Sequence, residues 1–462
     1  MNKQVTHQTI LTIAAVGMLT FIGILVETSM NVTFPTLMKL FGQPLSTVQW
    51  LTTGYLLMVT LIMGVTSFLL KRFDNRKLFL FGATLLLIGG LLCVVASDFL
   101  ILLCGRLLQA VATGISTPLM FSVIFTTIPI KKWGTYTGFA AMLISLAPAL
   151  GPAYGGIMNY YFSWRAIFVV TTFLIIISFV IGFLNFKSTQ PMRIAKFDLN
   201  GFFTLSTFLV SLEFGIQQLS SDFARAAILL FFSFFALGIF ITHEKNSQNV
   251  LFNPKIFKQR YLLFRLVNYF TLQMINISLS FIIPIYTENV LLVNSLIAGI
   301  VLLPGSLLGS VISPMAGRWY DRIGAKGPLV YSNWLVVLGI LLFTILIDHL
   351  SIIMIGLIFV IVRIGFNLGF GNTMTDASKA VTLEQQADQN ALFNMSQQYA
   401  GSIGTSIMST IINFQEKSAT TSHNSITHGS QLGFAFLLLF GLNALILTLI
   451  SNKTSPSKQV HY

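Results

Sequence analysis

Charged residues are scarce in this chain. Only 9% of its 462 residues are Asp, Glu, Lys or Arg, whereas a soluble globular protein has roughly 25%. Hydrophobic residues make up 55%, phenylalanine alone occurs 42 times, and the mean hydropathy is +0.81. This composition excludes an ordinary soluble domain and predicts an all-α polytopic membrane protein.

Residues suited to metal binding or catalysis are few, and they lie in the wrong places. The histidines all fall at the termini or between apolar runs: His7, His243, His349, His423, His428 and His461. The sequence has no G-x-x-x-x-G-K-[ST] loop, which excludes this route to nucleotide hydrolysis. We therefore expect no metal site, no cofactor and no enzymatic activity.

Cysteine occurs only twice, as Cys93 and Cys104, on either side of the short turn ASDF. The two thiols could approach each other. We expect instead that both are buried separately, since free cysteine usually packs as a small hydrophobic residue.

Acidic residues are also fewer than basic ones, and the net charge is +13. The basic residues lie in short clusters between apolar runs, without a basic aromatic face or a basic arm. This pattern excludes nucleic acid as the expected partner.

Long apolar runs are what the chain has in abundance. A helix needs about 20 apolar residues to cross the hydrocarbon core. The first run is too long for a cleaved signal peptide, and many more follow it. We predict fourteen spans, at 9–31, 49–70, 78–96, 100–127, 136–160, 165–186, 199–219, 224–241, 263–286, 297–316, 328–347, 351–372, 391–412 and 432–450.

The basic residues between these spans predict the orientation. With the N-terminus in the cytoplasm, twenty of the 27 Lys and Arg residues fall in cytoplasmic segments and four in outer segments. The positive-inside rule therefore favours an even number of spans with both termini in the cytoplasm, as in a multi-pass protein of a bacterial cytoplasmic membrane.

Three arginines remain inside the predicted spans: Arg106, Arg265 and Arg363. Arg265 lies near a cytoplasmic helix end, from which its side chain could snorkel to the membrane surface. Only two acids, Glu27 and Glu213, fall well inside spans. Charged residues at this depth are costly, which makes them candidates for function.

The chain also contains an internal repeat. The turn SFLLKRFDNRK follows span 2 and the turn GRWYDRIGAK follows span 10, while Arg106 and Arg363 open similar segments in spans 4 and 12. We predict two six-helix bundles, at 1–190 and 263–462, with two inserted transmembrane helices at 191–242 and a cytoplasmic connector at 243–262. Such duplications are typical of transporters.

Several motifs resemble one family. They are ETSMNVTFP in span 1, VQWLTTGYLL in span 2, GRLLQAVATG in span 4, APALGPAYGG in span 5, LLPGSLLGSVISPMAGRWYDRIGAK in span 10 and QQYAGSIGTSI in span 13. Together they resemble the major facilitator superfamily, and within it the fourteen-helix drug:proton antiporters of the EmrB/QacA type. The resemblance covers nearly the whole chain and implies the major facilitator fold.

The resemblance also implies a cytoplasmic gate in the turns after spans 2 and 10. The family's Gly, Asp and Gly are replaced by Ser67, Lys71 and Asp74 in the first turn. The second turn retains all three. The gate candidates are Lys71, Arg72, Asp74, Arg76, Gly317, Asp321, Arg322 and Gly324. We expect Asp321 to lie at a helix N-terminus, where the macrodipole stabilises an acid; a solvated turn is the alternative.

Glu27 and Arg106 are the candidates for proton coupling. They lie at matching depths in helices that border the central cavity of the resembled fold. Desolvation favours the protonated form of a carboxyl group, while a neighbouring arginine favours the ionised form. The alternatives are a permanent ion pair that staples two helices and an exposed outer rim. Gln109, on the Arg106 face, could orient either residue or only pack.

The APALGPAYGG segment resembles the antiporter motif. Its residues are Pro148, Gly151, Pro152, Gly155 and Gly156. Small residues let helices approach closely, and prolines bend them. The segment is therefore either a bent hinge that closes a leak across the membrane or simple helix packing.

The remaining candidates are polar residues inside spans. Arg363 requires an aqueous cavity or a partner from another helix, in a substrate, gate or anchoring role. Other candidates for lining the cavity are Asn31, Trp50, Tyr55, Asn367, Asn394 and Gln398. Glu213 lies in an inserted helix, away from the expected pathway.

These observations favour a monomeric, proton-coupled multidrug exporter. Its expected partners are amphipathic small molecules, protons and membrane lipids, with the proton as coupling ion. A lipid or dedicated-metabolite exporter is an alternative. A polytopic acyltransferase-like enzyme is disfavoured because the histidines are misplaced, and a sensor is disfavoured because no soluble domain is appended.

Overall fold

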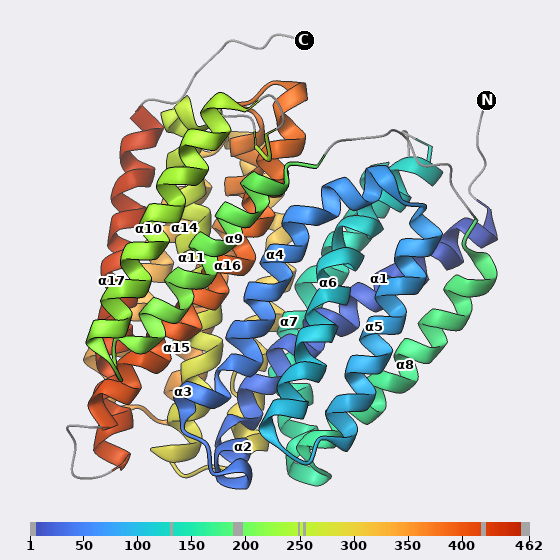
Figure 1. Ribbon diagram of the computed structural model, residues 1–462. Helices are drawn as coiled ribbons and strands as arrows, with labels where there is room; N and C mark the ends of the chain where they lie inside the picture. Colours follow the sequence, from blue (N-terminus) through green and yellow to red (C-terminus); the bar gives the residue numbers. More distant parts are fainter. Residues whose placement is uncertain are drawn as a thin grey trace. The chain divides into compact units, whose positions relative to one another are not determined.

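The computed structural model describes residues 6–129, 133–187, 197–247, 250–252, 256–416 and 422–453. All regular secondary structure within these ranges is helical. The chain folds as two compact units: Met1–Phe197 with Val293–Leu303, and Asp198–Leu292 with Pro304–Tyr462. Figure 1 shows their helices in sequence colours.

The first unit contains most of the N-terminal helices. They are α1 His7–Ser29, η1 Met30–Thr33, α2 Phe34–Phe41, α3 Leu45–Val48, α4 Trp50–Arg72, α5 Asn75–Val95, α6 Phe99–Thr127, α7 Trp133–Tyr161, α8 Trp164–Asn185 and the short α12 Ser295–Ile300.

The second unit contains the other helices. They are α9 Leu199–Gln218, α10 Phe223–Asn246, η3 Ile256–Lys258, α11 Arg260–Asn289, α13 Leu303–Ile323, α14 Lys326–Ile345, η4 Ile347–His349, α15 Ile352–Ser378, α16 Leu383–Glu416 and α17 Ser422–Lys453.

Short polar residues begin several of these helices. The Asp98 carboxylate accepts from the Ile101 backbone amide at 3.0 Å, and Ser351 caps α15 in the same way. Such caps satisfy amides that have no partner within the helix. Gly42 and Gly324 have φ values of 61° and 79° directly after α2 and α13, where a residue without Cβ is favoured.

The two units repeat one packing scheme. In the first unit α1 packs against α6, α7 and α8; in the second, α11 packs against α15, α16 and α17. Likewise α5 packs against α6 and α8, and α14 packs against α15 and α17. The described helices thus show the internal repeat that the sequence predicts.

Helices α9 and α10 pack against each other, and α9 also packs against α16 in the second unit (Figure 1). They are the least buried of the described spans. In the most apolar stretch of each helix, 28% of α9 and 22% of α10 is buried inside the protein, compared with 78% of α11. Lipid contact explains their many exposed phenylalanines. The bounds predicted for the bundles, the insert and the connector remain a prediction.

Twelve described helices are long and apolar enough to cross a membrane. Two further long helices, α7 and α16, coincide with the other two predicted spans. Some basic residues behind the predicted orientation lie outside the described residues, among them Lys131, Lys132, Arg193 and Lys196.

The expectation for the cysteines was half right. Both are free, and Cys93 is buried, but Cys104 is exposed. Cys104 lies on the outward face of α6, a position that an apolar sequence pattern does not distinguish from the core.

Candidate functional site

Glu27 lies in the last turns of α1, where the sequence is apolar on both sides. Its residue surface is only 4% exposed, and its Oε2 atom has no hydrogen-bond partner among the described residues. The fully buried Tyr55 and Arg106 interact electrostatically with it. The carboxyl group is thus held in the interior of the first unit beside a cation.

Arg106 on α6 is fixed by other partners. Its Nη1 donates to Oε1 of Gln109 at 3.0 Å, and its Nε donates to the carbonyl oxygen of Leu51 at 3.3 Å. Its guanidinium carbon lies 4.1 Å from the centre of the Tyr55 ring. The prediction that Gln109 orients Arg106 is consistent with this bond.

Tyr55 joins three helices around this cation. Its hydroxyl donates to the Gly23 carbonyl of α1 at 2.9 Å and lies 2.6 Å from Oγ1 of Thr113 on α6. A Cβ at Gly23 would overlap the Thr113 side chain, so glycine permits this close approach of α1 and α6. The contact fixes the ring face on which the Arg106 guanidinium rests.

No ion pair joins Glu27 to Arg106 among the residues that the structure describes. The stapling alternative requires such a pair. The observed arrangement leaves the Glu27 carboxyl near a positive charge but without an ion pair to it.

Two further predicted residues lie in the same unit. The Thr52 hydroxyl donates to Oδ1 of Asn31 at 2.8 Å, while Nδ2 of Asn31 is buried without a partner within the described residues. The half-buried Trp50 lies on α4 against Gly54. Asn31 therefore has a donor available for a further polar group.

The glycines of the predicted antiporter motif on α7 all lie at close helix contacts. A Cβ at Gly151 would overlap Thr28, and a Cβ at Gly155 would overlap the Ser29 carbonyl, both on α1. On the neighbouring face Gly156 contacts the backbone of α12, whose Gly299 meets the Pro152 carbonyl. With Pro148 and Pro152 inside the helix, the motif is a close-packed seam within the first unit; its hinge role stays a prediction.

Arg363 on α15 finds its partner on another helix. Its Nη1 donates to Oδ1 of Asn276 on α11, and its guanidinium carbon lies 5.2 Å from the Phe366 ring centre. Asn367 donates back to the Arg363 carbonyl at 2.9 Å. The sequence missed Asn276, although a buried amide is the kind of partner that a lone arginine needs.

The last two cavity candidates lie on α16 and differ in exposure. Asn394 is exposed, whereas Gln398 is buried. A separate cavity of about 500 Å³ in the second unit contains neither of them. Its lining residues are Leu266, Val267, Phe270, Thr271, Ser396, Leu439, Phe440 and Asn443.

The first predicted gate turn is held within its own unit. Asp74 caps α5 by accepting from the Arg76 amide at 3.1 Å, and Nη2 of Arg76 donates to the Phe183 carbonyl of α8 at 3.1 Å. Arg72 is exposed. The Lys71 side chain lies outside the described residues.

The second predicted gate turn differs from the expectation. Asp321 lies in the last turn of α13, which runs to Ile323, and not at a helix N-terminus. The predicted span ended at residue 316, but Gly317 does not end the helix. The helix ends at Ile323, directly before Gly324 with its positive φ. Asp321 and Arg322 are both exposed, so the macrodipole argument fails and the solvated alternative fits better.

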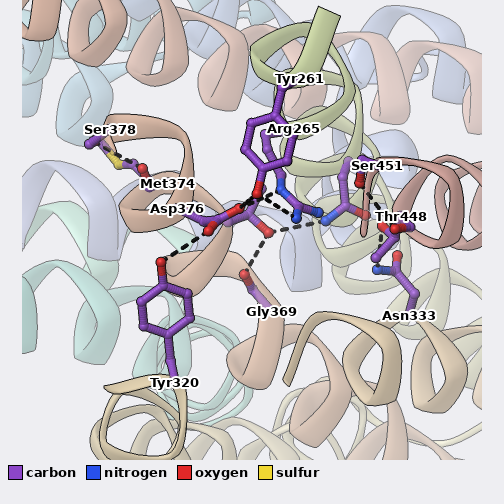
Figure 2. Close-up of polar contacts among 12 residues, drawn as sticks. Tyr261, Arg265, Tyr320, Asn333, Gly369, Met374, Asp376, Ser378, Thr448 and Ser451 are labelled. Carbon is purple, nitrogen blue, oxygen red and sulfur yellow. Dashed lines mark hydrogen bonds and ion pairs between the residues drawn. The ribbon is translucent and has the colours of Figure 1, made fainter. Parts of the chain in front are cut away.

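The acid that organises this end of the second unit is instead Asp376 (Figure 2). Its Oδ2 accepts from Nε of Arg265 at 2.7 Å and from the Tyr261 hydroxyl, and its Oδ1 accepts from the Tyr320 hydroxyl at 3.0 Å. One carboxylate therefore ties α11, α13 and α15 together.

Two predictions are corrected by this network. Arg265 does not snorkel, because its residue surface is 0% exposed. Asp376 was overlooked because the predicted span ended at residue 372, whereas α15 continues to Ser378. The available signal was an acid and an arginine of opposite charge at the same expected membrane level.

Comparison with known proteins gives a consistent assignment. Residues 16–405 match the family described as Major Facilitator Superfamily. The lincomycin resistance protein LmrB of Listeria innocua is 28% identical over 96% of each chain. The multidrug resistance protein B homolog of Mycobacterium tuberculosis is 27% identical over 81% of this chain and 71% of its own.

Solved structures agree on the fold. A bacterial homolog of the human lysosomal transporter Spinster, in an inward-facing and unoccupied conformation, aligns with a TM-score of 0.73 over 99% of each chain. The sequence identity is 14%, so this likeness concerns the fold alone.

Proposed function

Because the chain belongs to the Major Facilitator Superfamily, we propose that it is a proton-coupled exporter of amphipathic drugs. The relatives named for lincomycin and multidrug resistance support drugs as the substrate class. The chain is a multi-pass membrane protein. The proposal extends to fourteen spans, cytoplasmic termini, a monomeric state and a bacterial cytoplasmic membrane.

The observation that supports proton coupling most directly is the state of Glu27. A carboxyl group that is 4% exposed, with an unpartnered oxygen, is expensive to keep ionised in the membrane interior. The nearby Arg106 lowers that expense without an ion pair to Glu27. Its Nη1 and Nε bind Gln109 and Leu51, and its Nη2 has no partner among the described residues. Both protonation states are therefore accessible.

The coupling step follows from this balance. The ionised carboxylate of Glu27 takes one proton from the outer side to become a neutral acid, and releases it on the cytoplasmic side after the transporter has changed its access. A monocationic substrate and a proton cannot both neutralise this one carboxylate, so the binding of one displaces the other. This exclusion is the basis of antiport for monocationic substrates in the proposal.

The substrate range follows from the interior of the chain. Most buried residues are apolar, and buried charges are few. Pockets of this kind favour largely apolar molecules with few polar groups. We therefore expect neutral, zwitterionic or monocationic amphipathic substrates.

The experiment uses purified protein in liposomes with an imposed pH gradient. Uptake of ethidium, a permanent monocation, is followed in inside-out orientation at zero membrane voltage, beside a drug panel that includes lincomycin in a host without its own pumps. Uptake that requires the pH gradient supports the proposal. Gradient-independent movement contradicts proton coupling, and an unchanged drug panel contradicts the substrate class.

A further inference from the structure

The second unit contains a buried carboxyl group that the proposed function does not use. Glu213 lies in the C-terminal half of α9, one of the two inserted helices, and its residue surface is 0% exposed. Neither carboxyl oxygen has a hydrogen bond of standard geometry among the described residues. An acid at this place requires an explanation, because α9 otherwise faces its surroundings with apolar side chains.

Glu213 faces a polar stripe on α16. Tyr399, Ser402, Ser406 and Thr410 follow one another at spacings of three and four residues, so they share one side of that helix. The hydroxyls of Ser402 and Ser406 interact with the Glu213 carboxyl. The carboxyl group thus lies at the interface of α9 and α16, inside the second unit.

Two hydrogen bonds fix this interface on either side of Glu213. The Tyr399 hydroxyl donates to the Leu209 carbonyl of α9 at 2.9 Å, and the Thr410 hydroxyl donates to the Ile216 carbonyl at 3.4 Å. Residues 209, 213 and 216 lie on one face of α9. The glutamate is therefore turned toward α16, not toward lipid.

No cation neutralises Glu213 within the described residues. On α10, which packs against α9, Arg225 is paired with Asp222 at 3.0 Å and His243 contacts Asp198. On α16 the Tyr399 hydroxyl is the titratable group that interacts with Glu213. An ionised carboxylate in these surroundings has no counter-charge, which membrane burial penalises strongly.

We propose that Glu213 is a second proton-binding residue, neutral in this arrangement, that exchanges its proton with water when α9 and α16 separate during transport. Serine hydroxyls both donate and accept hydrogen bonds, so Ser402 and Ser406 can hold the Glu213 carboxyl in either protonation state. Ser409 and Asn413, joined at 3.4 Å, extend the polar residues toward the C-terminal end of this helix.

This inference rests on the proposed function for its role in transport, but not for the protonation state. Infrared difference spectroscopy of the reconstituted protein, wild type minus Glu213→Gln, tests that state directly. We expect a protonated carboxylic-acid band at neutral pH. Glu213→Asp is the second variant and should shift this band. Asp222→Asn is the matched control, since Asp222 lies on the same insert, is partly exposed to water and is paired with Arg225; this substitution should leave the Glu213 band unchanged.

Two spectral outcomes overturn the inference. Carboxylate bands for Glu213 at neutral pH would show that the residue rests ionised. A protonated band that disappears when choline chloride is replaced by sodium chloride would identify a sodium site instead.

The number of coupled protons is measured in a separate experiment. It is obtained from the limiting ethidium gradient at zero voltage. Each coupled proton multiplies this gradient by about tenfold per unit of pH difference, because tenfold corresponds to about 1.4 kcal/mol. We expect about a hundredfold limit for the wild type and about tenfold for Glu213→Gln. A structural role would slow the approach to the limit without changing it.

The outcomes of this measurement are distinct. Equal limits for the two proteins, or a wild-type limit of only about tenfold, overturn the second proton and leave the proposed function intact. Absence of any pH-driven gradient in the wild type contradicts the proposed function, and the infrared result then decides the protonation state of Glu213 alone.

Discussion

Arg265 and Asp376 form a buried ion pair with 2.7 Å between Nε and Oδ2, and two tyrosine hydroxyls complete the carboxylate (Figure 2). Glu27 is the opposite case: it is buried near Arg106 but not bonded to it. An acid whose oxygens are all hydrogen-bonded holds helices together, whereas an acid with an unpartnered oxygen can change its charge. This contrast separates the structural acid from the one proposed for coupling.

Glu27→Gln should abolish ethidium accumulation driven by a pH gradient, because glutamine cannot exchange a proton. Exchange of labelled for unlabelled ethidium without a gradient should persist. Both are measured in proteoliposomes, with Asp98→Asn as a control that removes a carboxylate at the start of α6 but preserves the cap. If Glu27→Gln still accumulates ethidium fully under a pH gradient, the coupling proposal is wrong.

Asp376→Asn should lower the free energy of unfolding by about 3–5 kcal/mol, because it leaves the Arg265 cation buried without its counter-charge. Thermal unfolding in detergent measures the effect. The double variant Arg265→Gln/Asp376→Asn should recover part of the loss.

The control for that prediction is the exposed pair of Arg225 and Asp222, in which the side chains are 76% and 37% exposed. Asp222→Asn should change stability by less than about 1 kcal/mol. An equal loss in both single variants would contradict the structural role of Asp376.

Tyr55→Phe should destabilise the first unit by roughly 1–2 kcal/mol, since it removes the hydroxyl that bonds Gly23 and Thr113. Tyr55→Leu should lose more, because it also removes the ring beneath Arg106. Thermal unfolding ranks the variants. Identical midpoints for Phe and Leu would show that the ring contact is not stabilising.

Gly155→Ala should impair transport and lower the unfolding temperature, because the new Cβ would overlap the Ser29 carbonyl and force α7 away from α1. Gly238→Ala on α10 is the matched control: open space surrounds it, and alanine is the better helix former. The contact is unimportant if the two variants transport equally at equal protein level.

A rigid bis-pyridinium dication should be exported poorly compared with the matching mono-pyridinium. The buried acids of the described spans are Glu27, Glu213, the already paired Asp376, and Glu244, which accepts from the Leu251 and Phe252 amides. A second positive charge therefore lacks a partner and must be desolvated alone. Efflux in vesicles is compared in the wild type and in Glu213→Gln. Equal rates for both compounds in both proteins would refute this.

The sequence predicted the helices well because their signal is local. Runs of apolar residues mark α5, α8 and α14 to within a few residues, since the hydrocarbon core demands a minimum length of apolar chain. Helix ends were less predictable. α15 extends one turn and more past its predicted end, and that extension is what places Asp376 in the interior.

The candidate site was predicted in part. One unit does bring together four of the predicted residues: Glu27, Arg106, Tyr55 and Gln109. The charged ones were predictable because a charge inside an apolar span is recognisable from the sequence alone. Their bonds were not predictable. The bond to Gln109 lies within α6, whereas the distance from Arg106 to Glu27 depends on how α1 packs against α6, where Gly23 meets Thr113.

The sequence by itself determined that this is a multi-helix membrane protein with a repeated plan and a few charges inside its spans. Length, hydropathy and the rarity of charge are sufficient for that, since each span must satisfy its own backbone in lipid. Only the tertiary structure decided which charge has a partner. Arg265 has Asp376, Arg363 has Asn276, and Glu213 is turned toward the hydroxyls of α16. Partners from different helices are set by packing between residues about 90 to 190 positions apart, which no local pattern encodes.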